Sequence, residues 1–201
     1  MTVTLVLGGA RSGKSGYAKH AAEVAAQAAG GRLVMLVTAE ALDEEMKARI
    51  AAHKAGRGKE WSTVEAPIDL AKAITELKPD DRAVIDCLTV WVANLLAKDI
   101  DIEEQTFALL DALSHRRSPT WLITNEIGSG IAPEDAPARR FRDACGRLHQ
   151  QLAAEADQVV LMVAGLPPAG EIKTPARGAR QGFLQHRRGR SPDRKSGGVR
   201  N

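Results

Sequence analysis

The chain has 201 residues, of which 44% are hydrophobic and 26% charged, a size and composition typical of a single globular domain. It contains no apolar run of the ~18 residues that a membrane-spanning helix needs. Its first residues, MTVTLVLGG, lack the basic segment of a signal peptide. These features exclude a membrane-embedded protein, and we expect a cytoplasmic one.

The net charge of +3 is unevenly distributed along the chain. Residues 167–201 contain nine Lys or Arg and two Asp or Glu, a net charge of +7, which leaves −4 on the first 166 residues. Because this segment is rich in Gly, Pro and Arg, we predict one domain over residues 1–167 and a disordered basic tail over 168–201. Basic tails can bind nucleic acid or acidic membranes, but no aromatic or helical pattern accompanies the charge. We therefore expect no nucleic-acid partner.

Strand-like apolar runs and helical stretches alternate along the domain. Strands are predicted at residues 3–7, 32–38, 83–87, 120–124 and 158–164. Helices are predicted at residues 15–29, 42–55, 67–77, 88–97, 102–116 and 136–156. This alternation predicts an α/β fold in which helices cover both faces of a mainly parallel sheet. The two cysteines, Cys87 and Cys145, have no metal-binding spacing and are predicted to be reduced thiols.

The sequence GGARSGKS, residues 8–15, follows the first strand and precedes the first helix. Its spacing, Gly8-x-x-x-x-Gly13-Lys14-Ser15, is that of a P-loop, and the strand-to-helix context makes the match credible. In a P-loop, backbone N–H groups surround phosphate oxygens, the lysine reaches the β- and γ-phosphates, and the hydroxyl coordinates Mg²⁺. We therefore predict nucleotide binding here rather than a structural glycine turn.

Two further strand ends carry polar side chains. Asp86 ends the run AVID, where a P-loop enzyme places a carboxylate for Mg²⁺; the alternative is an acidic cap for the following helix. The sequence TNEIGSG places Asn125, Glu126 and a glycine turn after the strand at 120–124. Because open α/β sheets bind ligands at the carboxyl ends of their strands, this loop is a second candidate for substrate binding. An ordinary loop is the alternative.

The stretch EEMKARIAAHKAGRGKEWSTVE, residues 44–65, has an unusual pattern of basic residues. Arg49, His53 and Arg57 are four residues apart and would share one face of a helix. Flanking arginines repel a metal ion but suit a phosphate ester, and they keep an imidazole neutral, as a nucleophile must be. A solvated helix face with an incidental histidine explains the spacing equally well.

Taken together, these segments closely resemble the bifunctional adenosylcobinamide kinase / adenosylcobinamide-phosphate guanylyltransferases of cobalamin biosynthesis. The resemblance runs through GGARSGKS, DEEMKARIAAHKAGRGKEWSTVE, IDCLTVWVANLL and the region from TNEIGSG to VAGLP. Its most specific part is the string RI-x-x-H-x-x-x-R-x-x-x-W, which is matched by Arg49, Ile50, His53, Arg57 and Trp61.

The resemblance implies a RecA-like P-loop transferase with two reactions. ATP or GTP phosphorylates the aminopropanol hydroxyl of adenosylcobinamide, and GTP then donates GMP to that phosphate, which gives adenosylcobinamide-GDP and pyrophosphate. The histidine of RI-x-x-H becomes guanylylated in the family, which implies catalytic roles for His53 and, through the P-loop, for Lys14. It also implies a homotrimer. The P-loop and the acid at the end of AVID predict Mg²⁺ held by Ser15 and Asp86. Because the TNE-x-G loop is expected on the nucleotide side of the sheet, we expect it to face the corrinoid.

By the same resemblance, the nucleotide contacts are Gly8, Gly9, Ala10, Arg11, Ser12, Gly13, Lys14, Ser15, Val37, Thr38, Ala39, Lys54, Ala55, Gly56, Arg57, Glu65 and Asp86. Family chains usually end with a short hairpin after VAGLP, whereas residues 168–201 continue here without an apolar return strand. Two alternatives are a P-loop kinase of another small metabolite, in which His53 only binds phosphate, and a nucleotide-dependent binding protein that uses the basic tail.

Overall fold

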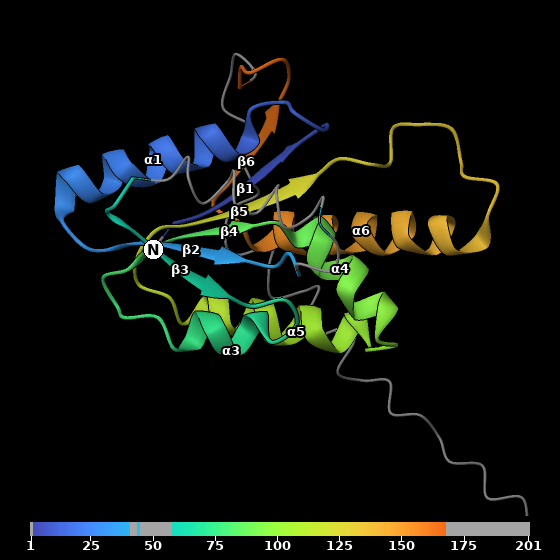
Figure 1. Cartoon of the computed structure of the whole chain (residues 1–201), viewed down its shortest axis with the longest axis horizontal. Coiled ribbons are helices and arrows are strands. Elements are labelled where there is room, and N and C mark those ends of the chain that lie inside the picture. Colours follow the sequence, from blue (N-terminus) through green and yellow to red (C-terminus); the bar gives the residue numbers. More distant parts are fainter. Residues whose placement is uncertain (1, 41–43, 45–57, 168–201) are drawn as a thin grey trace, which may run out of the picture.

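The computed structural model describes residues 2–40, 44 and 58–167, in which strands and helices alternate (Figure 1). In chain order, the elements are β1 Val3–Gly8, α1 Lys14–Ala29, β2 Leu33–Val37, β3 Trp61–Glu65, α3 Leu70–Thr75, β4 Arg82–Asp86, α4 Leu88–Ala97, α5 Ile102–Ser114, β5 Thr120–Asn125, α6 Ala136–Glu155 and β6 Gln158–Met162. The predicted helix at 42–55 lies outside the described residues except for Glu44.

Six strands form one sheet in the order β3-β2-β4-β5-β1-β6, and every neighbouring pair is parallel. All five residues of β2, with the sequence LVMLV, are buried, because a parallel strand inside the sheet is covered on both faces. The predicted α/β fold with a mainly parallel sheet is confirmed. The strand order places β5 between β1 and β4, so the polar residues after these three strands share one edge of the sheet.

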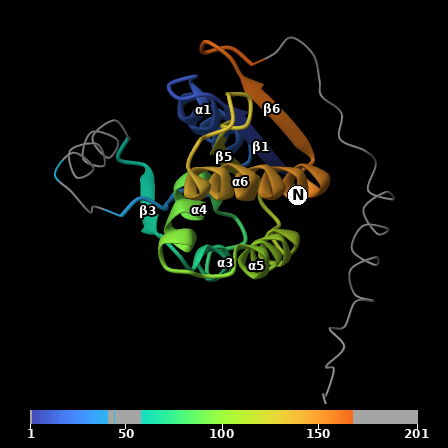
Figure 2. The ribbon, with the colours of Figure 1, turned by 90° about the vertical axis from the view of Figure 1, so that its right-hand side faces the viewer.

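The helices are divided unequally between the two faces of the sheet (Figure 2). Helix α1 packs on one face, where Ala18 and Ala22 belong to a core that includes Met35. Helices α3, α4, α5 and α6 pack on the other face, where Trp91 and Leu5 are both fully buried. Both faces of the sheet therefore carry helices, as predicted.

Strand β3 is missing from the sequence prediction. Its sequence, WSTVE, has only two apolar residues, Trp61 and Val64, and three of its five positions are exposed. As the edge strand of the sheet, β3 lacks the continuous apolar run by which the inner strands are recognised. The other predicted strands and helices in the described ranges are found, with ends shifted by up to three residues.

Cys87 and Cys145 are both free thiols, which confirms the prediction. None of the helices within residues 2–40 and 58–167 is long and apolar enough to cross a membrane.

At the amino ends of the strands, a buried carboxylate is surrounded by cationic and N–H donors. The fully buried side chain of Asp81 accepts hydrogen bonds of 2.9 and 2.8 Å from Arg32 and one of 2.9 Å from the N–H of Lys78. Burial alone would raise the pKa of Asp81, but these hydrogen bonds outweigh it, and the pKa is lowered. Asp81 is therefore a paired, ionised group.

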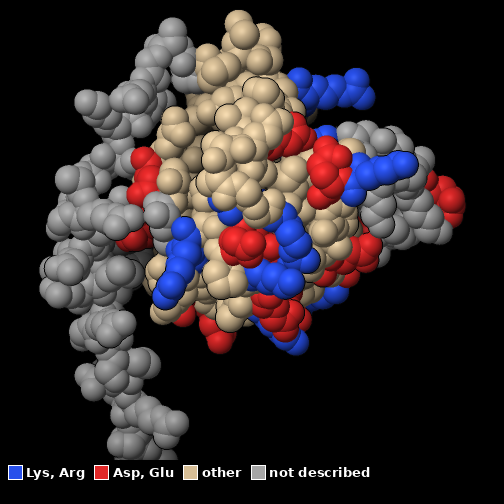
Figure 3. Space-filling view, turned by 90° about the vertical axis from the view of Figure 1, so that its left-hand side faces the viewer, with Lys and Arg blue, Asp and Glu red and all other residues tan. Residues whose placement is uncertain are grey.

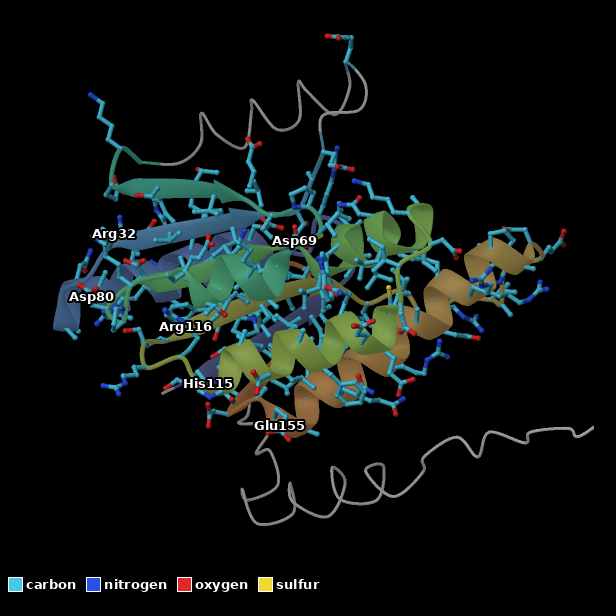
Figure 4. All side chains as sticks on the ribbon, turned by 90° about the horizontal axis from the view of Figure 1, so that it is seen from below. Arg32, Asp69, Asp80, His115, Arg116 and Glu155 are labelled. Atoms are coloured by element: carbon cyan, nitrogen blue, oxygen red, sulfur yellow. The ribbon has the colours of Figure 1, made fainter. Side chains whose placement is uncertain are left out.

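The same end of the sheet holds a buried arginine. Arg116 is only 6% exposed, and its guanidinium donates to the carbonyl oxygens of Lys78, over 2.9 Å, and of Asp81. Arg32, Asp80 and Arg116 lie toward this end in Figure 4, and Figure 3 shows basic and acidic side chains intermixed over it. We call Arg32, Asp81 and Arg116 the amino-end cluster.

Candidate active site

The loop between β1 and α1 is held in a glycine-dependent conformation at the carboxyl edge of the sheet. Gly13 has a φ of +92°, which L side chains rarely adopt, and a Cβ added there would lie 3.0 Å from Cα of Gly165. The N–H of Gly165, in the turn after β6, donates to the carbonyl oxygen of Ser12 over 3.0 Å. The turn after β6 therefore supports the P-loop from outside the motif.

The first turn of α1 is left open to an anion. Asp101 and Asp135 cap α5 and α6 by accepting hydrogen bonds from backbone N–H groups. Gly13 stands at the corresponding position of α1 and supplies no side-chain cap. Uncapped N–H groups and the positive end of the helix dipole attract phosphate, so this helix end fits the predicted role.

Lys14 is 7% exposed and lies across the loop. Its Nζ donates to the carbonyl oxygen of Gly9 over 2.5 Å and to Oγ of Ser12 over 3.3 Å. Burial lowers the pKa of Lys14, while the neighbouring Cys87 and Asp86 act in the opposite direction. The acceptors of this ammonium group are neutral atoms of the loop, which a phosphate oxygen can replace with a stronger, charged acceptor.

Ser15 and Asp86 meet beside the lysine although they lie 71 residues apart. Oγ of Ser15 donates to Oδ2 of Asp86 over 2.9 Å. A hydroxyl and a carboxylate oxygen at this separation are donors that suit Mg²⁺, which prefers oxygen ligands and completes its shell with phosphate and water. The pair therefore fits the predicted metal role, and the N-cap of α4 is Cys87, without a side-chain capping hydrogen bond.

The predicted nucleotide contacts after β2 and β3 lie on the same edge as the P-loop but farther along it. Val37 is paired in register with Asp86 and with Glu65. Thr38 is fully buried, and its hydroxyl is engaged by Cys87, donating to its carbonyl over 2.8 Å and accepting from its N–H over 3.0 Å. Glu65 is exposed and lies four strand positions from β1, which corresponds to about 19 Å.

The loop after β5 adjoins the P-loop directly. Asn125 is paired in register with Gly8, and the N–H of Glu126 donates to the carbonyl oxygen of Gly8 over 3.0 Å. The Glu126 carboxylate accepts hydrogen bonds of 2.7 Å from the Ser129 hydroxyl and from the N–H of Gly128. The bond from Ser129, together with the two loop N–H groups, lowers the pKa of Glu126 despite partial burial. Glu126 thus keeps its charge beside the phosphate loop.

The predicted nucleophile and its neighbours fall outside the described residues. These are Arg49, His53, Lys54, Ala55, Gly56 and Arg57, and their roles stay predictions. The structure brings together Gly8–Ser15, Asp86 and the residues after β5, and it places Val37, Thr38 and Ala39 three strand positions away from β1 along the same edge.

Three polar residues behind this edge were missed by the sequence analysis. Asn94 donates to the carbonyl oxygens of Thr38, over 2.8 Å, and Pro67, over 3.0 Å, and so ties together the chain segments after β2 and β3. Thr89 and His149 form a second set of hydrogen bonds behind Asn125. Thr89 and Asn94 are polar residues within an apolar helix, a signal that indicates a buried partner but does not identify it. His149 lies in a largely polar helix and carries no such signal.

This geometry defines a protein of the P-loop class, with a phosphate loop at the carboxyl edge of a parallel sheet. Residues 4–169 match the family described as cobinamide kinase / cobinamide phosphate guanyltransferase, and the chain belongs to that family.

The match with this chain covers nearly the full length of each curated relative. The chain is 40% identical over 178 residues to the bifunctional adenosylcobalamin biosynthesis protein CobU of Salmonella typhimurium, which covers 81% of this chain and 96% of the relative. It is 40% identical over 168 residues to CobP of Pseudomonas aeruginosa, covering 81% and 94%, and 38% identical to CobU of Escherichia coli. The predicted family is confirmed, and with it the assignment as a bifunctional transferase.

Similarity to solved structures is weaker. A KaiC-like protein, PH0186, from Pyrococcus horikoshii has a TM-score of 0.48 and 19% identity, over 80% of this chain and 70% of that one. The flagellar accessory protein FlaH from Methanocaldococcus jannaschii has a TM-score of 0.47 and 12% identity over the same shares. The family assignment rests on the sequence match.

Proposed function

We propose that this protein phosphorylates adenosylcobinamide with ATP or GTP and then transfers GMP from GTP to the resulting phosphate, forming adenosylcobinamide-GDP. The observation that carries this proposal is the buried ammonium of Lys14 beside the Ser15–Asp86 pair, at the uncapped end of α1. This arrangement can bind the phosphates of a triphosphate in either reaction. The family supplies the acceptor and the order of the two steps.

In the first reaction, the acceptor hydroxyl oxygen bonds to the γ-phosphorus as the bond to the β,γ-bridging oxygen breaks. The nucleoside diphosphate leaves, and the hydroxyl proton passes to solvent. Lys14 and the open N–H groups of α1 hold and stabilise the charge on the phosphate oxygens, and they are fixed in place before the reaction. Ser15 and Asp86 would hold Mg²⁺, which, when bound, neutralises phosphate charge. Asn125 and Glu126 stand next to Gly8, where an acceptor can reach the γ-phosphate.

In the second reaction, we propose that an imidazole nitrogen of His53 bonds to the α-phosphorus of GTP and pyrophosphate leaves. The phosphate of the first product then attacks the same phosphorus, and His53 is released. The P-loop holds the leaving pyrophosphate. We propose that Val37, Thr38, Ala39 and Glu65, with residues 54–57, contact the remaining parts of the nucleotide. We also propose that the enzyme is a cytoplasmic homotrimer.

The covalent step is tested by incubating the protein with GTP labelled at the α-phosphate. We expect protein-bound label that is lost in acid, as a phosphorus–nitrogen bond requires, and that is absent from His53→Ala. His115→Ala is the matched control, because His115 is exposed at the amino end of the sheet and should keep the label. The kinase reaction of His53→Ala should continue.

Two results would contradict parts of this proposal. Kinase activity without any labelling would remove the guanylyltransferase half and leave a P-loop kinase in which His53 only binds phosphate. Equal loss of both reactions in His53→Ala would contradict the proposed separation of roles. Sedimentation equilibrium of the whole chain tests the trimer.

A further inference from the structure

A line of hydrogen bonds runs between β5, α4 and α6 and ends at the candidate active site. The N–H of Asn125 donates to Oγ1 of Thr89 over 2.7 Å. Oγ1 of Thr89 lies 3.1 Å from Oγ1 of Thr124, which lies 2.8 Å from Nε2 of His149. Thr124 is fully buried and Thr89 is 7% exposed. The line therefore lies inside the protein, behind the phosphate edge.

The donors and acceptors along this line can all point from Asn125 toward a neutral His149. Each threonine hydroxyl has a single proton, and the oxygen of Thr89 already accepts from Asn125. In this arrangement, Thr89 donates to Thr124, and Thr124 donates to Nε2 of His149, whose own proton is on Nδ1. Burial lowers the pKa of His149, although Glu126 acts in the opposite direction, and this favours the neutral ring. His149 is the terminal acceptor of this arrangement.

The other end of the line fixes the backbone at the end of β5. Asn125 is paired with Gly8 on one side, while its strand pairs with β4, which ends in Asp86, on the other. The Asn125 residue therefore lies between the phosphate loop and the carboxylate predicted to hold Mg²⁺. The described part of the chain offers its carboxamide no hydrogen-bond partner. That half-buried group remains available to a substrate phosphate or hydroxyl.

We propose that His149 is a positioning residue for phosphoryl transfer. Through Thr124 and Thr89 it holds the backbone of Asn125, and it thereby places the Asn125 carboxamide at the phosphate edge. If His149 served only the core, its hydrogen bonds would stay among core groups. Instead, the line from His149 reaches the backbone N–H of Asn125 at the edge of the site. This inference rests on the proposed kinase function only where it is tested by kcat.

Isosteric removal of one hydroxyl tests the line with little change in volume. Thr124→Val should lower kcat for phosphoryl transfer to adenosylcobinamide roughly tenfold, the effect of one buried hydrogen bond, with KM for the nucleotide within about twofold. Thr120→Val is the matched control. Thr120 is fully buried in the same strand, at its opposite end, and its hydroxyl donates to the carbonyl oxygen of Ser118 over 3.4 Å. It should keep the wild-type kcat.

His149 itself is tested with two substitutions. His149→Leu should lower kcat about as much as Thr124→Val, whereas His149→Gln keeps a polar atom near the Nε2 position and should regain at least about half of the lost activity. If Thr124→Val fails to fold, Thr124→Ser and Thr89→Ser take its place. They keep the hydroxyls and should stay close to the wild-type kcat, while His149→Leu still provides the loss.

Hydrogen–deuterium exchange separates this inference from the proposed function, because it needs no substrate. The peptide that contains Asn125 and Glu126 should exchange faster in Thr124→Val and His149→Leu than in the wild type, and at the wild-type rate in Thr120→Val. Unchanged exchange in the first two variants, or an equal loss of kcat in Thr120→Val, would overturn the positioning role. A wild-type protein that does not phosphorylate adenosylcobinamide would overturn the proposed function alone.

Discussion

The two ends of the sheet both contain buried charged groups, but they satisfy them in different ways. At the amino end, Asp81 is bound by Arg32 and by the N–H of Lys78, and Arg116 by backbone carbonyls. At the carboxyl end, Lys14 has only neutral acceptors from its own loop, and the first turn of α1 has no side-chain cap. Removing one partner of a buried charge pair destabilises a protein, whereas a buried ammonium without a strong acceptor is prepared for an anionic ligand.

The largest expected effect comes from removing that ammonium group. Lys14→Ala should lower both phosphoryl and guanylyl transfer by roughly 10²-fold or more, because a preorganised charge at the reacting phosphate is lost. The midpoint of urea unfolding should change little, since no charged partner is left unpaired. Lys72→Ala is the control, because Lys72 is exposed and forms only a loose surface ion pair with Glu76, over 3.9 Å, which contributes little. A large loss of stability in Lys14→Ala would contradict the contrast between the two ends.

The next effect concerns the amino-end cluster and should appear in stability alone. Asp81→Asn should lower the free energy of unfolding by roughly 2–3 kcal/mol, because Arg32 and the N–H of Lys78 lose a charged acceptor. Asp80→Asn, at the exposed neighbouring position, should change it by less than about 0.5 kcal/mol. Urea denaturation measures both, and kcat of the folded protein should be unchanged. Equal effects of the two substitutions would show that the cluster is not a stabilising feature.

The smallest effect is a difference in how the two ends of the sheet make the free energy of unfolding depend on pH. The pKa of His149 is lowered from 6.5 by burial, so the unfolded chain takes up this proton first, and stability falls as the pH drops below about 6.5. The pKa of Asp81 is lowered from 3.8, so its stabilising contribution is present above pH 3.8 and is lost as the pH falls through the lower, folded pKa.

These two pH windows can be separated by substitution. The free energy of unfolding of His149→Gln should decline less than that of the wild type just below pH 6.5, whereas that of Asp81→Asn should decline less below pH 3.8. Urea midpoints measured across this range test the assignment. The same curve for His149→Gln and the wild type between neutral pH and pH 5 would contradict a neutral, buried His149.

Much of the fold and part of the site could be predicted from local patterns. The inner strands are continuous apolar runs, and the P-loop is an eight-residue motif between one strand and one helix, so both were found. Strand β3 was missed because an edge strand with exposed Ser62, Thr63 and Glu65 has no such run. Thr89, Asn94 and His149 were missed because each binds a backbone or side-chain group far away in the sequence.

By itself, the sequence determined the alternation of strands and helices, the phosphate loop and the family, because each is recorded in short stretches of adjacent residues. Only the tertiary structure decided which strand ends became neighbours. The strand order brought Asp86 to Ser15 and placed Asn125 beside Gly8, and packing of α4 and α6 brought Thr89, Thr124 and His149 into line behind them. These contacts depend on how the crossovers return to the sheet, which no local pattern specifies.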